Sequence, residues 1–224
     1  MLAGVNGAGK SSVGGSGLRE AGLDWYNPDT VTREARAAGL GLEEANEYAW
    51  KQGVARLKEA MAKLTNFAFE TTLGGRTIVE LLIAATKTHD VKMWYCGLAS
   101  VDQHIARVAQ RVAAKGHAIP EARIRERWTT SRVHLVRLMP HLALLQVYDN
   151  SVDAALGDDI PEPRLVLEMS NGTVVAPDRR DPQALLAVPS WAKSLVEAAF
   201  RTTGKSPPGG AVPAVPRQGK VRPK

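Results

Sequence analysis

Residues 4–12 read GVNGAGKSS and fit the pattern G-x-x-x-x-G-K-[ST]. In this pattern the glycines let the backbone curl so that consecutive N–H groups face one anion. The lysine adds a positive charge at the outer phosphates, and the hydroxyl that follows can coordinate Mg²⁺. We therefore expect a bound nucleotide here rather than a purely structural glycine turn. The residues expected to hold ATP are Gly4, Asn6, Gly7, Ala8, Gly9, Lys10, Ser11 and Ser12, with Lys10 also catalytic and Ser11 the Mg²⁺ ligand.

Short apolar runs alternate with longer helical patterns along the chain. This alternation predicts a mostly parallel sheet with crossover helices, in the three-layer α/β fold of P-loop NTPases. Strands are predicted at 1–4, 23–26, 67–70, 91–98 and 144–148, with a hairpin at 164–175 that turns at Asn171-Gly172. Helices are predicted at 10–21, 31–38, 43–64, 76–88, 101–115, 121–139 and 182–200.

The 224 residues, of which 44% are hydrophobic, suffice for one substantial core but are short for two full domains. We expect one domain over residues 1–202 and a basic, Pro- and Gly-rich disordered tail over 203–224. The tail holds five basic residues and no acidic one, so the net charge of +6 leaves about +1 for the rest. Nucleic-acid binding is therefore expected only weakly, through the tail.

The single cysteine, Cys96, excludes an intramolecular disulfide and fits a reducing cytoplasm, which is the expected location. No apolar run approaches the ~18 to 20 residues that span a bilayer. Only three residues precede Gly4, whereas a strand normally runs about 5 to 6 residues. Either the natural start lies upstream, or the central strand is short and the stability of the protein is reduced.

Asp29 follows the second predicted strand, in the sequence YNPDTV. Ligands of a doubly wound fold bind at the carboxyl edge of the sheet, so this carboxylate is a candidate catalytic and substrate-binding group. Asn27 and Pro28 shape a turn that would hold it still. The alternative is that Asp29 serves as the N-cap of the helix that begins near Thr30.

Glu70, Thr71 and Thr72 emerge at the same edge, after the strand residues 67–69. A hydrolytic motor of the Walker B type would show four apolar residues followed by Asp or Asp-Glu, but only Glu70 is present. One carboxylate and two hydroxyls suit the binding of a polar substrate. This strand therefore favours a kinase over a motor ATPase.

The helix predicted at 101–115 begins with a capping-box pattern, in which Ser100 accepts from a backbone N–H and the side chain of Gln103 reaches back. Its apolar residues form one stripe. Along a flank of that stripe lie His104, Arg107 and Arg111, which predicts a cationic edge beside a buried face.

A lid is expected around residues 115–128, because phosphoryl transfer needs cations over the migrating group and arginines on a mobile segment can supply them. Arg125 and Arg127, on the helix predicted at 121–139, are candidate substrate-binding residues. For each lid arginine the alternative is a solvated or ion-paired surface role. The buried stripe of that helix is predicted to contain Ile124, Trp128, Leu135 and Leu138.

Asp149 and Asn150 follow the last core strand, in the sequence VYDNS. The loop after this strand lies near the base in P-loop kinases, so both residues are expected either to contact adenine or to fix the loop. An ordinary Asx turn is the alternative.

Taken together, GVNGAGKSS, YNPDTV, FAFETTLGGRT, GLASVDQHIARVAQRVAAKGHAIPEARIRERW and VYDNS resemble the zeta toxin family of P-loop kinases, in order from about residue 2 to 152. The lid reads AKGH, where related chains often have two glycines before the histidine. The resemblance implies an adenylate-kinase-like fold and transfer of the γ-phosphoryl of ATP to the 3′-hydroxyl of UDP-N-acetylglucosamine.

By this resemblance Lys10 and Ser11 would hold ATP and Mg²⁺, Asp29 would be the base, and Glu70 would position the sugar. Arg107 or Arg111 would stabilise the moving phosphoryl group, and an antitoxin is a candidate partner. Two alternatives stay open: a kinase for another hydroxylated metabolite or an antibiotic, and an ATP-binding regulatory module without phosphotransfer.

Overall fold

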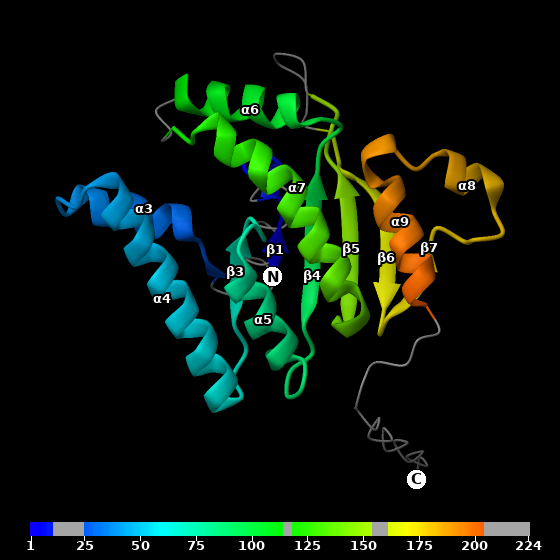
Figure 1. Cartoon of the computed structure of the whole chain (residues 1–224), viewed down its shortest axis with the longest axis horizontal. Helices are drawn as coiled ribbons and strands as arrows, with labels where there is room; N and C mark the ends of the chain where they lie inside the picture. The colour runs from blue at the N-terminus through cyan, green and yellow to red at the C-terminus, as the bar shows by residue number, and fades with distance from the viewer. Residues whose placement is uncertain (11–24, 114–117, 154–160, 204–224) are drawn as a thin grey trace, which may run out of the picture.

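The computed structural model describes residues 1–10, 25–113, 118–153 and 161–203 (Figure 1). These residues contain one seven-stranded sheet with the order β2-β3-β1-β4-β5-β6-β7. The first five strands in that order are parallel, and β6 and β7 continue the sheet as an antiparallel hairpin. The strands are β1 Leu2–Ala3, β2 Trp25–Tyr26, β3 Ala68–Thr71, β4 Lys92–Gly97, β5 Leu144–Asp149, β6 Arg164–Ser170 and β7 Thr173–Ala176.

Helices α5, α7 and α9 cover one face of this sheet, and α6 crosses above the carboxyl ends of the strands (Figure 1). Helices α3 and α4 form a hairpin that extends from the β2 edge. This arrangement confirms the predicted α/β class with a mostly parallel sheet. The helices are α3 Pro28–Ala37, α4 Leu42–Lys63, α5 Arg76–Ala85, α6 Val101–Ala113, α7 Glu121–Leu138, the 3₁₀ helix η1 Met139–His141, α8 Pro182–Leu186 and α9 Ser190–Thr202.

Most predicted elements are present with boundaries that differ by one to three residues. The helix predicted as one unit at 182–200 is wrong, because the structure has two helices, α8 and α9, separated at Pro189. Proline lacks a backbone N–H and its ring collides with the preceding turn, so it begins a helix rather than continuing one. The helix predicted at 10–21 lies outside the described residues after Lys10.

The hydrophobic core lies between the sheet and its helices, and a second, smaller cluster lies above the strand ends. The smaller cluster joins Val5 of the glycine-rich loop to Val108 of α6 and Ile124 of α7. On α7 the predicted buried stripe is confirmed for Ile124, Leu135 and Leu138, whereas Trp128 is only partly buried. The loop at residues 4–10 therefore rests on α6 and α7.

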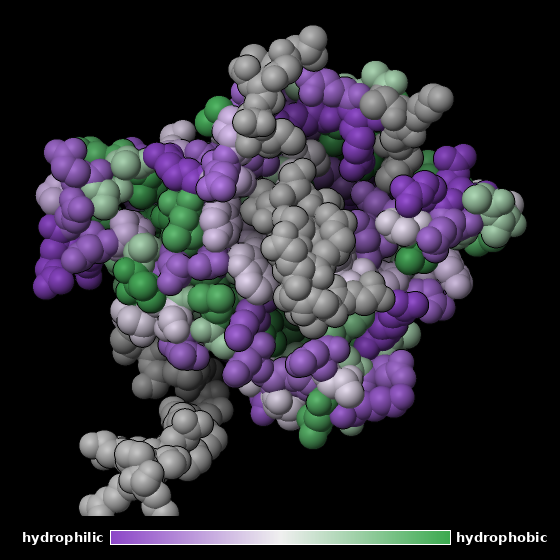
Figure 2. All heavy atoms as spheres, turned by 180° about the vertical axis from the view of Figure 1, so that it is seen from behind, coloured by the Kyte–Doolittle hydropathy of each residue, from purple (hydrophilic) through white to green (hydrophobic). Residues whose placement is uncertain are grey.

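Hydrophilic side chains predominate on the face opposite to that of Figure 1, and hydrophobic ones form small separate groups among them (Figure 2). Within the described ranges, no helix combines the length and the apolar composition that a membrane span needs.

Candidate active site

The loop of residues 4–10 has a shape that requires glycine at three positions. Gly4, Gly7 and Gly9 have φ values of +138°, +82° and +80°. An added Cβ would collide with the Cys96 carbonyl at Gly4 and with the Asn150 side chain at Gly9, and at Gly7 it would lie 2.8 Å from the His104 carbonyl oxygen. The left-handed residues Gly7 and Gly9, two positions apart, are typical of a backbone nest that binds an anion. The loop thus fits a phosphate group.

Lys10 ends this loop and is 8% exposed. Its Nζ lies 3.4 Å from Oε1 of Glu70, a residue near the carboxyl end of β3. The same Nζ donates to the Val5 carbonyl at 3.5 Å. The positive charge is therefore held between the glycine-rich loop and the end of β3.

Asn27 connects Glu70 to Asp29. The Asn27 Nδ2 donates to Glu70 Oε2 at 3.1 Å, and its Oδ1 accepts from the backbone N of Asp29 at 2.9 Å. Asn27 is thus the N-cap of α3, which corrects the alternative in which Asp29 caps that helix. A continuous line of polar contacts runs from Lys10 through Glu70 and Asn27 to the first turn of α3, where Asp29 lies.

Arg111 of α6 lies beside Asp29, with Nη1 3.5 Å from Oδ2. The two side chains are 40% and 46% exposed, so a substrate can reach both. The Nε and Nη2 atoms of Arg111 are buried and have no hydrogen-bond partner among the described residues. The guanidinium charge beside Asp29 suits an anionic group bound next to that carboxylate.

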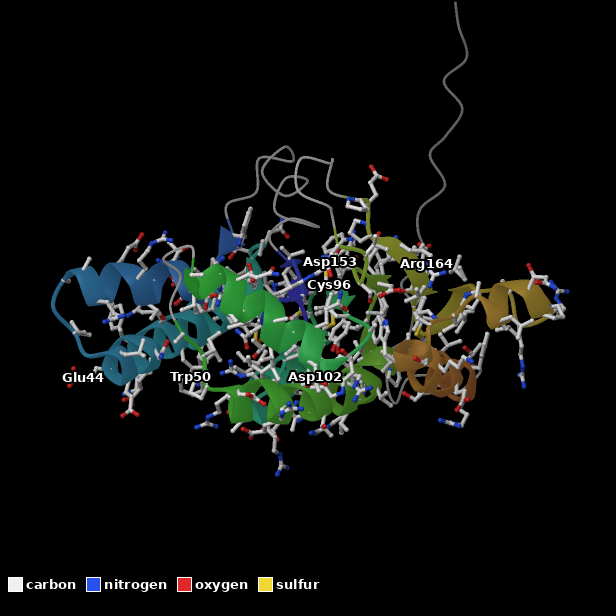
Figure 3. All side chains as sticks on the ribbon, turned by 90° about the horizontal axis from the view of Figure 1, so that it is seen from above. Glu44, Trp50, Cys96, Asp102, Asp153 and Arg164 are labelled. Carbon is white, nitrogen blue, oxygen red and sulfur yellow. The ribbon has the colours of Figure 1, made fainter. Side chains whose placement is uncertain are left out.

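The other three predicted site arginines, Arg107, Arg125 and Arg127, lie in different surroundings. Arg107 donates from Nε to Asp153 Oδ1 at 2.8 Å, which holds the pKa of that carboxyl below its usual range, and from Nη2 to the Val152 carbonyl at 3.2 Å. Seen from above in Figure 3, Asp153 lies beside α6, near the centre of the molecule. Arg107 thus ties α6 to the segment after β5.

Arg127 of α7 reaches the glycine-rich loop, where its Nη1 donates to Asn6 Oδ1 at 2.7 Å. Burial lowers the pKa of Arg127, and the nearby charge of Arg123 acts in the same direction whereas that of Asp29 opposes it. Arg125 of α7 is 49% exposed and pairs with Glu121 and Asp102. The structure brings Arg127 to the loop but holds Arg125 in ion pairs at the surface.

The predicted cationic edge of α6 is wrong for His104, which carries no charge at ordinary pH. It has no exposed surface, and burial lowers its pKa to about 4, so the imidazole is neutral at ordinary pH.

Gln103 also departs from the capping-box prediction. Its backbone N donates to Ser100 Oγ at 3.2 Å as expected, but its side chain donates to the Ser151 carbonyl and to Asp153 instead of reaching back.

Asn150 fixes the glycine-rich loop from the other side, because its Nδ2 donates to the Ala8 carbonyl at 3.0 Å and its backbone N to Gly97 at 3.0 Å. Asp149 accepts from Trp191 Nε1 at 3.1 Å and from the Ser151 hydroxyl. Trp191 belongs to α9, so the last helix supports the segment that holds the loop. The contact of Asn150 with Ala8 agrees with the predicted role of fixing the loop, and contact of either residue with adenine stays a prediction.

Thr71 and Thr72 follow Glu70 at the end of β3. The Thr71 hydroxyl accepts from the backbone N of Leu73 at 3.0 Å, and Leu73 has a φ of +55° although it is not glycine. The Leu73 carbonyl accepts from His134 Nδ1 of α7 at 2.8 Å. The segment after Glu70 is therefore a fixed turn packed against α7.

Three residues with clear contacts in this site were not among the predicted site residues. They are Asn27, His104 and Trp191. The sequence NPD after a strand does predict a turn at Asn27, but not its bond to Glu70. Nothing in the local sequence marks Trp191, because its partners lie about 40 residues earlier.

The predicted Mg²⁺ ligand Ser11 and its neighbour Ser12 lie outside the described residues, as does the segment 114–117 of the predicted lid. In the part of the chain that the structure describes, no group of three His, Cys, Asp or Glu side chains could hold a metal ion. The tail from residue 204 onward also lies outside the described residues.

No family model matches the sequence, and no curated protein matches it significantly. Crystal structures of the AvrRxo1-ORF1:AvrRxo1-ORF2 complex do match the fold. They were determined with sulphate ions (TM-score 0.57), with ATP (0.56) and in native form (0.58). Each matched chain is 15% identical, and the alignments cover 92% of this chain and 75 to 76% of the matched chains. At this identity the similarity shows that the chain shares its α/β fold with a chain of that complex.

Proposed function

We propose that the protein is an ATP-dependent kinase that phosphorylates a hydroxyl group of a small molecule. The observation that carries this proposal is the line of contacts from Lys10 through Glu70 and Asn27 to the helix turn of Asp29. It joins a glycine-rich loop that fits a phosphate to an accessible carboxylate at the same edge of the sheet. A kinase needs these two groups side by side, because the phosphoryl donor and the acceptor must meet.

In the proposed reaction Asp29 accepts the proton of the acceptor hydroxyl. The hydroxyl oxygen then bonds to the γ-phosphorus of ATP as the bond to the β-phosphate oxygen breaks, and ADP leaves. Arg111, whose guanidinium lies next to Asp29, would stabilise the negative charge of the transferred group. Mg²⁺, with Ser11 as the proposed ligand, would neutralise charge on the phosphates.

ATP as the nucleotide is supported by the fold comparison, since a chain with the same fold was crystallised in a complex with ATP. UDP-N-acetylglucosamine is the first acceptor to test because the sequence resembles zeta toxins. Another hydroxylated metabolite or an antibiotic is the alternative acceptor. An antitoxin partner is part of the same proposal, and the matched chains were likewise crystallised in a complex with a second protein.

The nucleotide part of the proposal is tested by equilibrium titration of the purified protein with MgATP and with a non-hydrolysable analogue. The variant Gly9→Ala should bind ATP about ten-fold or more weakly, because the added Cβ collides with Asn150 and strains a left-handed position. Gly39→Ala is the matched control: Gly39 also has a left-handed φ, of +102°, but nothing lies near its Cβ position. Absence of ATP binding by the unmodified protein would refute the proposal.

A further inference from the structure

Asn6, the third residue of the glycine-rich loop, is held at both of its oxygen atoms. His104 of α6 contacts the backbone carbonyl through Nδ1 at 2.8 Å, and Arg127 of α7 donates to the side-chain oxygen at 2.7 Å. Asn6 is 5% exposed and His104 has no exposed surface. These two bonds connect the loop to α6 and to α7, whose first turns belong to the predicted lid at residues 115–128.

Packing supports the same connection. Val5 of the loop lies in the small hydrophobic cluster with Val108 of α6 and Ile124 of α7. Gly7 approaches α6 so closely that an added Cβ would lie 2.8 Å from the His104 carbonyl oxygen and 3.3 Å from Val108 Cγ2. A displacement of α6 or α7 would therefore disturb the loop.

The contacts also define which ring nitrogen of His104 carries the proton. A carbonyl oxygen can only accept, so Nδ1 must be the protonated nitrogen of the neutral ring. The other nitrogen, Nε2, is buried without a hydrogen-bond partner among the described residues. Trp128 of α7 packs edge-on against the ring, with centroids 5.3 Å apart. The imidazole is thus enclosed between the loop and α7, where it donates one bond.

We propose that His104 is a positioning residue which, together with Arg127, fixes the glycine-rich loop at Asn6 and so makes nucleotide binding depend on the placement of α6 and α7. The effect on ATP rests on the proposed function. Fixing of the loop itself does not, because both contacts join groups of the protein to each other.

Three variants of His104 separate this role from simple core packing. Asparagine places an N–H donor at the same distance along the side chain as Nδ1, whereas glutamine places it one bond further away. Leucine removes the donor and leaves the Asn6 carbonyl buried without it. We expect His104→Leu and His104→Gln to bind ATP about ten-fold more weakly, and His104→Asn to stay within about three-fold of the unmodified protein. Since His104 acts through the loop, KM for ATP should rise while kcat changes little.

A second measurement needs no ligand. Backbone amide hydrogen exchange of residues 4–10 should become faster in His104→Leu and His104→Gln, and return toward the unmodified rate in His104→Asn. His134→Leu is the matched control, because His134 also contacts a backbone carbonyl through Nδ1, but that of Leu73, in another segment. It should leave exchange at residues 4–10 unchanged.

The two measurements distinguish two kinds of failure. If the unmodified protein binds no ATP, the proposed function is wrong, and the exchange rates still decide whether His104 fixes the loop. If ATP binds but all three variants exchange and bind like the unmodified protein, the role of His104 is refuted. The same holds if His104→Asn behaves like His104→Leu, because a retained donor would then make no difference. Should His104→Leu fail to fold, the comparison of asparagine with glutamine gives the same decision.

Discussion

Lys10 Nζ lies 3.4 Å from Glu70 Oε1, and both side chains are almost fully buried, at 8% and 10% exposure. The lysine of the glycine-rich loop is therefore paired with a carboxylate of the protein itself. An incoming phosphate would have to share this charge with the carboxylate. The pair contributes both to the stability of the strand ends and to the proposed reaction.

Replacement of Lys10 by methionine should abolish turnover and lower the free energy of unfolding by about 3 kcal/mol, because Glu70 would lose its cationic partner in a buried site. Urea unfolding and steady-state kinetics measure the two effects. Lys51→Met is the matched control, since Lys51 pairs with Glu47 at 65% and 63% exposure, where an ion pair contributes at most about 1 kcal/mol. Equal stability losses in the two variants would contradict the role assigned to the buried pair.

Two substitutions of Asn27 should separate its two bonds. Asn27→Ala removes both the helix cap and the bond to Glu70, so it should cost about 1 kcal/mol of stability and also lower kcat. Asn27→Ser can still cap α3 but is too short to reach Glu70, so stability should be retained while kcat falls as in the alanine variant. A serine variant with the unmodified kcat would show that the contact with Glu70 plays no part in turnover.

Trp191→Phe should weaken ATP binding several-fold, although Trp191 is far from the loop in sequence. The variant keeps an aromatic ring on α9 but removes the donor to Asp149, next to Asn150, which holds the loop. The Tm of the variant should stay close to that of the unmodified protein. Trp50→Phe, at a 48% exposed position on α4 at one end of the molecule, is the control (Figure 3). If both variants bind ATP equally well, α9 does not support the nucleotide site.

Stability should depend on pH through His104. Burial lowers its pKa from 6.5 to about 4, and the charges of Lys10, Arg107 and Arg132 act in the same direction. Below pH 6.5 the unfolded chain therefore binds a proton that the folded protein excludes, so stability falls as the pH drops toward 4. Between pH 7 and 5 this residue should account for a loss of about 2 kcal/mol. His104→Asn, which does not titrate, should lose that much less in urea unfolding, and identical losses would contradict the assignment.

The sequence predicted most helices and strands, and the polar residues at the carboxyl edge of the sheet, because both depend on local patterns. Glycine spacing marked the loop at residues 4–10, and polar residues after apolar runs marked the ends of β2, β3 and β5. Pro189 was a local signal for a helix boundary, and the prediction of one helix at 182–200 did not take it into account. The roles given to individual site residues stay predictions.

Contacts between distant segments could not be predicted in this way. The helical periodicity placed His104 correctly on a flank of α6, but it could not show that the glycine-rich loop covers that flank and keeps the ring neutral. Likewise, Arg127 and Asn6 are 121 residues apart in the chain. Which arginine reaches the loop depends on how α6 and α7 cross above the sheet.

The most direct test of the proposed kinase activity is ADP release from MgATP with and without UDP-N-acetylglucosamine, measured for the unmodified protein and for Asp29→Asn, with the product followed by phosphorus NMR. We predict acceptor-dependent ADP release and a new sugar phosphate, and a decrease of ~10² to 10⁴-fold in Asp29→Asn with ATP binding retained. Asp178→Asn, at a surface ion pair with Arg180, should match the unmodified protein. An unchanged rate in Asp29→Asn would remove Asp29 from the mechanism, and the absence of phosphoryl transfer to this or any other hydroxylated acceptor would contradict the kinase proposal.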